Sequence, residues 1–317
     1  MTEPAADPPI RLIGRKMGQA LFDSAMDWKR VFGGNINHTS VALAVWLANT
    51  EYSLKDPALL RGSRHDGLTF DQLKPIIASH VATASDFDDE TARRYLTHLI
   101  ETGLLIRSDE GYALSPAFMG SADYGRLIDL STRRVLDLFS YLHQFEAVRV
   151  HLRSLSSEYD ISVIDNLDLR LTENRYIVHL HFMRLISKFS IERYFVLDDS
   201  KLLAMIGFGL FVENVRVCTA DPVMALQYGA YEPPLPASLK TPVSMRRLAI
   251  ALDTPQETIR RNVLQLEQSG FIVNTGKGYL VPGENLMLYE TMVSQSAAIA
   301  RLGADITHAL ADLDAMI

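Results

Sequence analysis

The chain has 317 residues, of which 48% are hydrophobic and 22% are charged, a balance typical of a soluble globular protein. Its formal net charge of −7 argues against a protein coated in nucleic acid but allows a local basic surface. The single cysteine, Cys218, excludes an intramolecular disulfide and fits a reducing cytoplasm. The start of the chain lacks the pattern of a signal sequence, and no apolar run is long enough to span a bilayer. We therefore expect a cytoplasmic protein with no membrane partner.

The first half of the chain alternates helical patterns with loops and ends on a long helix. Apolar residues recur at helical spacing before the Gly33-Gly34 pair. They recur again over Thr39–Thr50, where the pattern is apolar nearly all round and predicts a buried helix. The predicted segments are disorder over 1–9, helices over 10–32 and 39–50, a loop over 53–67, a helix-and-hairpin region over about 68–114 and one long helix over about 122–155.

The sharpest local pattern in the second half begins at Thr254. Thr254 is expected to cap a helix, and Glu257 to complete a capping box with it. Gly270 is expected to end that helix, as a glycine C-cap does. Two short apolar stretches, 271–273 and 279–281, are separated by a polar turn and predict a hairpin.

This pattern occurs twice, over 90–114 and again over 257–281. The residues ETARR at 90–94 match ETIRR at 257–261 except at the middle position, and Gly103 matches Gly270 without a gap. Weaker matches in nearly the same register extend over most of the chain, so the sequence predicts an internal duplication. The expected domains are a first repeat over 10–158, with its helix-and-hairpin core at about 68–114, and a second repeat over 159–317, with its core at about 243–281 and a C-terminal helix.

Just before Thr254, Ser244 is placed to cap a short amphipathic helix. Helix, tight turn, helix and hairpin is the order of a winged helix-turn-helix. The segment ETIRRNVLQLEQSGFIVNTGKGYLV is similar to the recognition helix and wing of GntR-type bacterial transcription regulators, and the flanking helices resemble the dimerisation layout of the MarR type. The expected fold is mainly α with small β-wings: a tandem, internally duplicated winged helix-turn-helix with flanking helices and pseudo-two-fold symmetry.

The resemblance implies a sequence-specific, DNA-binding transcriptional regulator. In the second core, arginine, asparagine and glutamine follow the helix face opposite its apolar stripe, and these side chains can contact base edges in the major groove. This core has five basic and three acidic residues between Val243 and Val281. The residues expected to contact DNA here are Thr258, Arg260, Arg261, Asn262 and Gln265 on the helix, Lys277 at the wing tip, and Arg246 and Arg247 on the preceding helix.

The first core has a less favourable charge for DNA. Between Leu68 and Leu114 there are four basic and eight acidic residues, and several carboxylates lie at the start of its recognition helix. They suit the helix dipole but would repel phosphate. The corresponding DNA-contact residues are Thr91, Arg93, Arg94 and His98. Whether this copy contacts DNA, supports the fold or binds protein remains open.

Double-stranded DNA is the expected partner, bound by a pseudo-dimer within one chain. A homodimer, a small-molecule effector and a protein partner remain open. The alternative functions are a winged-helix protein-interaction module in a chromosome-associated or signalling complex, and a replication-initiator-like protein. No catalytic constellation supports an enzyme, and no cofactor is expected. His179 and His181 point in different directions on a helix, so they are expected to be structural and no metal site is expected.

Overall fold

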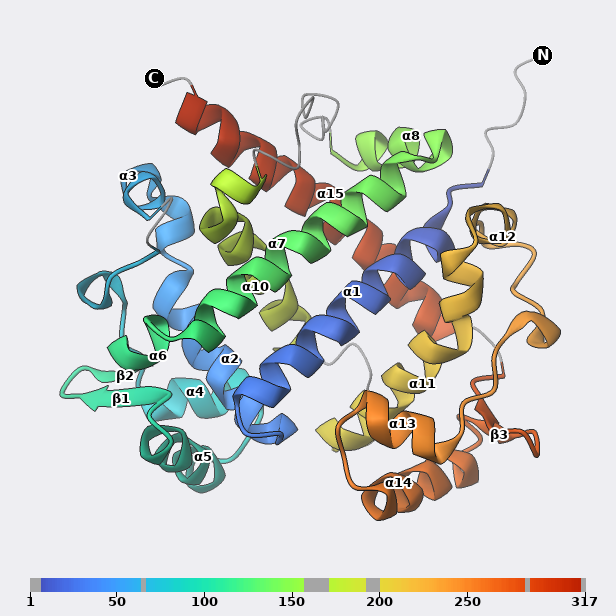
Figure 1. Cartoon of the computed structure of the whole chain (residues 1–317), viewed down its shortest axis with the longest axis horizontal. Coiled ribbons are helices and arrows are strands. Elements are labelled where there is room, and N and C mark those ends of the chain that lie inside the picture. The colour runs from blue at the N-terminus through green and yellow to red at the C-terminus, as the bar shows by residue number, and fades with distance from the viewer. Residues whose placement is uncertain (1–6, 64–66, 157–170, 192–199, 283–285, 315–317) are drawn as a thin grey trace. The chain divides into compact units, whose positions relative to one another are not determined.

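The computed structural model describes residues 7–63, 67–156, 171–191, 200–282 and 286–314. Within these ranges the chain is mainly helical, and its strands form two antiparallel pairs (Figure 1). The predicted class, mainly α with small hairpins, is confirmed at that level. The disorder expected over 1–9 and the repeat boundary at 158–159 lie largely outside the described residues.

The chain forms two compact units, and each is built from three separate stretches. Unit 1 consists of Met1–Met26, Leu138–Tyr159 and Phe195–Arg301, and unit 2 consists of Asp27–Asp137, Asp160–Tyr194 and Leu302–Ile317. The division falls inside the three longest helices of the described chain, which are α1 (Ile10–Val31), α7 (Ala122–His143) and α15 (Leu286–Asp314). Each of these helices therefore contributes residues to both units.

In unit 2, helix α2 (Ile36–Thr50) lies at the centre. It buries side chains on every side, including Val41, Val45 and Trp46, as its apolar pattern predicts. Helices α4 (Ala78–Ser85) and α5 (Asp89–Glu101) pack against it, as does the hairpin of β1 (Leu105–Ser108) and β2 (Gly111–Leu114). The unit also contains η1 (Ser53–Lys55), α3 (Pro57–Gly62), η2 (Phe70–Gln72), α6 (Pro116–Met119) and α10 (Arg175–Ile191).

In unit 1, helix α11 (Lys201–Ala220) has the same central place. Helices α13 (Met245–Ala251) and α14 (Gln256–Gln268) pack on it, and β3 (Val273–Asn274) pairs with β4 (Tyr279–Leu280). By length and composition α11 could cross a membrane, but 72% of its apolar window is buried inside the protein, as in the core helix of a soluble protein. The unit also contains α8 (Glu146–Leu155), α12 (Pro222–Gln227) and η4 (Ala237–Leu239).

A buried asparagine joins the central helix of unit 2 to the hairpin. The Asn49 side-chain amide donates hydrogen bonds to the carbonyl oxygens of Lys74, at 2.7 Å, and Tyr112, at 3.3 Å. Its side-chain oxygen accepts a hydrogen bond from the backbone N–H of Leu114 at 3.0 Å. Because buried backbone groups need partners, one side chain satisfies three of them where the hairpin meets the core.

Asn214 makes the same three kinds of bond in unit 1. Its amide donates to the carbonyl oxygens of Thr241, at 2.8 Å, and Tyr279, at 3.0 Å. Its side-chain oxygen accepts from the N–H of Val281 at 2.8 Å. Tyr279 and Val281 are the residues that the sequence repeat matches to Tyr112 and Leu114, so equivalent hairpin positions bond each asparagine.

A glycine lets a third backbone segment approach each hairpin. Gly111 and Gly278 have φ values of 139° and 143°. A Cβ atom on Gly111 would lie 2.5 Å from the carbonyl oxygen of Ile76, and one on Gly278 would lie 2.8 Å from the backbone of Val243. These close segments form isolated β-bridges to Tyr112 and Tyr279. Only glycine fits both the backbone conformation and the space.

Two expectations for the first half were wrong. The long helix expected over 122–155 is two helices, α7 and α8, because Phe145 is extended between them. The loop expected over 53–67 contains η1 and α3, and Asp56 caps α3 by accepting hydrogen bonds from the N–H groups of Ala58 and Leu59. The Asp-Pro pair at the start of α3 is a helix-start signal that the sequence contains.

The capping box expected at α14 was also wrong. The N-cap of α14 is Pro255, which has no side-chain cap, and the Thr254 hydroxyl donates to the carbonyl oxygen of Leu252 instead. The strand expected over 271–273 is shorter and begins at Val273. The Ser244 cap of α13 is confirmed, because its side chain accepts from the N–H of Arg247.

We predict that Asn214→Ala lowers the free energy of unfolding of the protein by about 1–3 kcal/mol, because it leaves buried backbone groups without partners. Asn49→Ala should have a similar effect. Chemical denaturation of both variants measures the loss. The matched control is Asn262→Ala, whose amide bonds only a carbonyl of its own helix, and it should change stability by less than about 0.5 kcal/mol. Equal stability of all three variants would contradict the role given to the buried asparagines.

Candidate nucleic-acid interface

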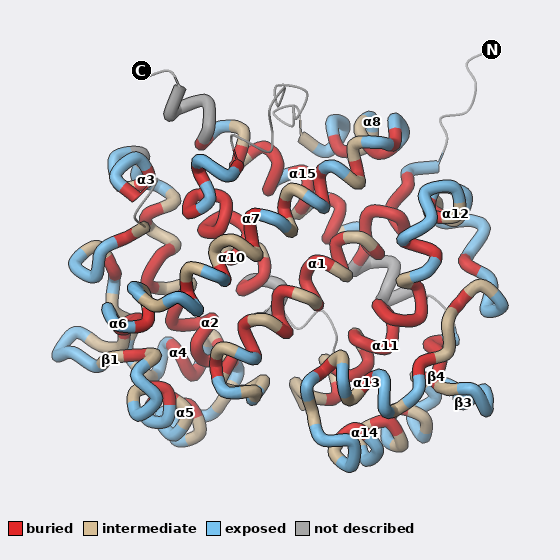
Figure 2. The backbone as a smooth tube through the Cα atoms, in the orientation of Figure 1, coloured by how far each residue is buried: buried red, intermediate tan, exposed pale blue. Residues whose placement is uncertain are grey.

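Helix α14 presents a polar face to solvent because its apolar face is fixed in the core. Ile259, Val263 and Leu266 are fully buried at helical spacing and pack in the core of unit 1. The opposite side of the helix is exposed, as are the residues of the adjacent hairpin turn (Figure 2). The structure therefore places the predicted DNA-contact residues of α14 where a ligand can reach them.

Glu257 organises the two arginines of this face. Its carboxylate accepts two hydrogen bonds from Arg260, at 2.8 and 2.7 Å, and one from Arg261 at 3.3 Å. These bonds, with that of Arg260 the largest cause, lower the pKa of Glu257 to about 2. The carboxylate is thus ionised at neutral pH, and the group of three side chains has a net charge of +1. This role of Glu257 differs from the capping role expected for it, although glutamate three and four residues before arginine is a known helical pairing signal.

The other predicted residues of α14 differ in how accessible they are. Asn262 donates its amide to the carbonyl oxygen of Thr258 at 2.8 Å, and both residues are half-buried. Gln265 lies one turn after Arg261 and is exposed. Arg261 is exposed, and its hydrogen bond goes to the side chain of Glu257 rather than to the backbone of this helix.

Lys277 lies at the tip of the β3–β4 hairpin and is exposed. The turn is held by the backbone N–H of Thr275, which donates to the carbonyl oxygen of Gly278 at 2.9 Å. The side-chain oxygen of Asn274 also accepts a hydrogen bond from the N–H of Gly276 at 2.9 Å. A defined turn thus presents an exposed cation at the tip of this hairpin.

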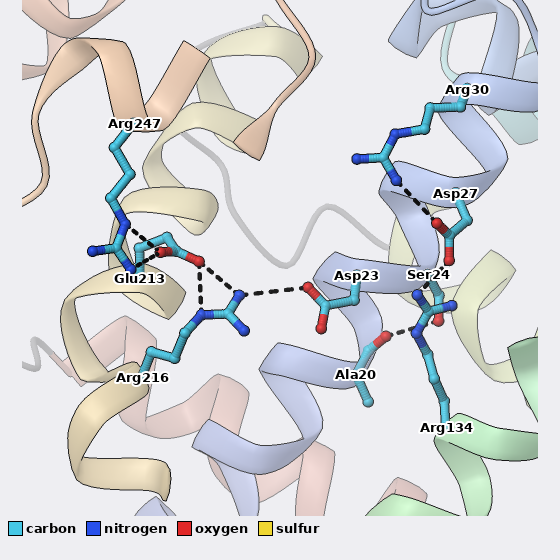
Figure 3. Close-up of polar contacts among 9 residues, drawn as sticks. All are labelled: Ala20, Asp23, Ser24, Asp27, Arg30, Arg134, Glu213, Arg216 and Arg247. Carbon is cyan, nitrogen blue, oxygen red and sulfur yellow. Dashed lines mark hydrogen bonds and ion pairs between the residues drawn. The ribbon is translucent and has the colours of Figure 1, made fainter. Parts of the chain in front are cut away.

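Arg247 belongs to an ion-pair network that the sequence did not predict. Its guanidinium contacts the carboxylate of Glu213 at 2.8 Å, and Arg216 contacts the same carboxylate at 2.6 Å (Figure 3). Arg216 also lies 3.5 Å from a carboxylate oxygen of Asp23. Glu213 is only 6% exposed, so Arg247 links α13 to the core helix α11. Arg246, its neighbour, is also exposed and stays the better candidate for a phosphate contact.

The DNA-contact residues predicted in the first half of the chain lie in a different setting. Arg93, Arg94 and His98 are exposed on α5, and Thr91 is half-buried at its start. The backbone N–H of Thr91 donates to the side chain of Asp88, which caps the helix. The exposed first turn also contains two further carboxylates, Asp89 and Glu90. A phosphate group approaching this end of α5 would meet negative charge.

Aromatic contacts occupy part of the same face of α5. His98 stacks on His38 of α2, with ring centroids 4.3 Å apart, and Tyr95 meets His38 edge-on at 5.1 Å. The side-chain amide of Asn37 donates to the Tyr95 hydroxyl at 3.0 Å. Burial, and secondarily the nearby His98, lower the pKa of His38. These contacts engage two side chains that a DNA-binding helix would use.

His179 and His181 lie in the core of unit 2 on α10. Both are buried, and Nδ1 of His179 lies 2.9 Å from the hydroxyl oxygen of Ser131. The rings of Trp28 and Trp46 pack around His179, with centroids 6.1 and 5.7 Å away. Within the described residues no cluster of three metal-ligating side chains occurs. Both side chains are therefore part of the core of unit 2.

We predict that acid destabilises the protein through these two histidines. Burial lowers the pKa of His179 to about 3 and that of His181 to about 4, whereas an unfolded histidine titrates near pH 6.5. The unfolded state therefore binds more protons below pH 6.5, and stability falls there by at most about 1.4 kcal/mol per pH unit for each histidine. Urea unfolding between pH 7.5 and 5 measures the slope. His179→Asn should reduce it and His80→Asn, at an exposed site, should not; an unchanged slope in His179→Asn would contradict the assignment.

The structure thus groups Glu257, Arg260, Arg261 and Gln265 on one accessible helix face, and it holds Arg247 in a separate network. The sequence was compared with protein-family models, and with curated proteins and solved structures. None of the three comparisons found a match.

Proposed function

We propose that the protein is a sequence-specific DNA-binding transcriptional regulator of the cytoplasm, and that α14 and the β3–β4 hairpin form its main DNA-binding element. The observation that supports this most is the accessible face of α14, where Arg261 and Gln265 lie opposite a fully buried apolar stripe. Arginine and glutamine are suited to guanine and adenine edges. Lys277 on the adjacent hairpin then supplies a phosphate contact.

We further propose that both units contain a winged helix and that the two arose by internal duplication. Asn49 and Asn214 tie their central helices to the hairpins with the same three kinds of hydrogen bond. Positive φ angles recur at Asp86 and Asp253 in the turn between the paired helices. These matches follow the register of the sequence repeat to within two residues.

The stretches that make up each unit also support an exchange of segments between the two repeats. The register of the repeat matches the stretch 27–137 of unit 2 to Phe195–Arg301 of unit 1. The same register matches Met1–Met26 of unit 1 to Asp160–Tyr194 of unit 2. Each unit therefore combines the winged-helix core of one repeat with the terminal helices of the other.

Equivalent packing supports this exchange. A Cβ on Gly14 of α1 would lie 2.4 Å from Met292 of α15, one turn before Ser296. The register that matches Asn49 to Asn214 also matches two further pairs, Gly14 with His179 and Ser131 with Ser296. In the other unit, His179 contacts Ser131 of α7. Both serines donate to the carbonyl oxygen four residues earlier in their helices. The first helix of each repeat thus packs on the same turn of the long helix from the other repeat.

The first winged helix is proposed as the weaker DNA-binding element, and one observation favours protein binding there. A surface cavity of about 350 Å³ lies between η2 and the β1–β2 turn. It is lined by the carboxylates of Asp71, Asp109 and Glu110 and by the exposed ring of Phe70. A partner with basic and apolar side chains would suit this cavity better than a nucleic acid would.

We predict separate effects for base and phosphate contacts. Arg261→Ala and Gln265→Ala should each weaken binding to a selected site by about 1–3 kcal/mol and relax the preference at particular base pairs. Lys277→Ala should weaken binding to all sequences and reduce the salt dependence by about one charge. Selection from random DNA, followed by titrations at several salt concentrations, measures both effects.

The matched control for Arg261 is Arg94, the equivalent arginine of α5. Arg94→Ala should cost less than Arg261→Ala, because carboxylates surround the start of α5. Any two-part site should also be asymmetric, since the two helix faces differ. Unchanged binding in Arg261→Ala, Gln265→Ala and Lys277→Ala would remove the support for a DNA regulator and favour the protein-interaction module.

We predict that cleavage between the repeats does not separate the chain. A protease site inserted between Tyr159 and Asp160 should give two fragments that co-elute as a 1:1 complex, because each unit needs segments from both. Either fragment expressed alone should fail to fold or should form a homodimer that replaces the missing helices. Size-exclusion chromatography with light scattering distinguishes these species. Two folded monomeric fragments would exclude the exchange of segments.

A further inference from the structure

Glu257 lies within the face that is proposed to meet DNA. It is one turn before Arg260 and Arg261, and the exposed fractions of the Glu257 and Arg261 side chains are 56% and 75%. Its three hydrogen bonds go to these arginines, and Pro255 leaves the start of the helix without a side-chain cap. The contacts of Glu257 therefore lie on the ligand face of α14.

An ionised carboxylate restricts which part of DNA can lie beside it. It has only acceptor oxygens, so it repels phosphate and the acceptor atoms of guanine. The exposed donors of the major groove are the amino groups of cytosine and adenine, and carboxylates accept from cytosine N4 in known readout. Adenine also presents the acceptor N7 beside its amino group, which disfavours a carboxylate.

The two arginines complete a recognition group for one kind of base pair. Arg261 makes the longer, single hydrogen bond to Glu257, at 3.3 Å, whereas Arg260 makes two shorter ones. Arg261 is thus the arginine that is released at the lower cost, while Arg260 keeps the carboxylate in place. A released arginine can donate both of its parallel N–H groups to guanine O6 and N7.

We propose that Glu257 is a specificity-determining residue of the DNA interface, which accepts a hydrogen bond from cytosine N4 while Arg261 contacts a neighbouring guanine. The preferred DNA therefore contains cytosine and guanine where the start of α14 enters the major groove. On other sequences Glu257 stays paired with both arginines, which lowers their attraction for phosphate. This inference rests on the proposed DNA-binding function.

Base selection with Glu257→Gln and Glu257→Ala tests it. Wild-type protein should select cytosine at one position, with about tenfold discrimination. Glu257→Gln should change that preference to adenine, because a side-chain amide can donate to N7 and accept from N6. Glu257→Ala should lose the preference. Both variants should bind non-specific DNA more tightly, with a salt slope steeper by about 0.9, because the arginines become available to phosphate.

Glu267→Gln is the control, since it removes one negative charge from the last turn of the same helix. It should leave the selected base unchanged. Circular dichroism checks that all the variants fold. If wild type selects a sequence and both Glu257 variants select the same one, the role of Glu257 is overturned while DNA binding stands. If wild type selects no sequence, the proposed function and this inference both fail.

Discussion

The buried asparagine at the centre of each unit is the interaction on which the candidate interface depends. The hairpins are short, and a two-stranded pair has little stability of its own in water. Asn214 fixes one such hairpin to the core helix α11. The segment at Val243 adds a β-bridge to Tyr279 of this hairpin. Helix α14 lies between these parts in the chain and packs on α11. The position of the polar face of α14 therefore depends on the hydrogen bonds of Asn214 inside an apolar core.

Charge distinguishes two units that share this framework. In unit 1 the buried Glu213 holds Arg247 and Arg216, and Glu257 holds the arginines of α14, so much of the positive charge is paired before any ligand arrives. In unit 2 the start of α5 carries exposed carboxylates, and its middle packs on His38. The two units thus present helix faces of different charge.

The sequence predicts those features that depend on local spacing. The apolar stripe of α14, the glycine stop at Gly270 and the buried α2 follow from periodicity and backbone preference, and the structure contains them. The break at Phe145 has no glycine or proline to signal it, and the Phe145 ring is buried there. The Glu213–Arg247 pair joins residues that are distant in the sequence, which only the fold brings together. The composition of the two units likewise depends on tertiary contacts.

The sharing of long helices between units has a consequence for how the chain can evolve. In a symmetric homodimer every substitution appears twice, so both copies of an interface must accept it. In the proposed duplicated chain, a residue can change in one repeat only. The pair Gly14 and His179 illustrates this freedom: one position has no side chain against Met292, and the other holds an imidazole among tryptophans. Under the proposed duplication, covalent fusion would allow two matched scaffolds to diverge in the surfaces that they present.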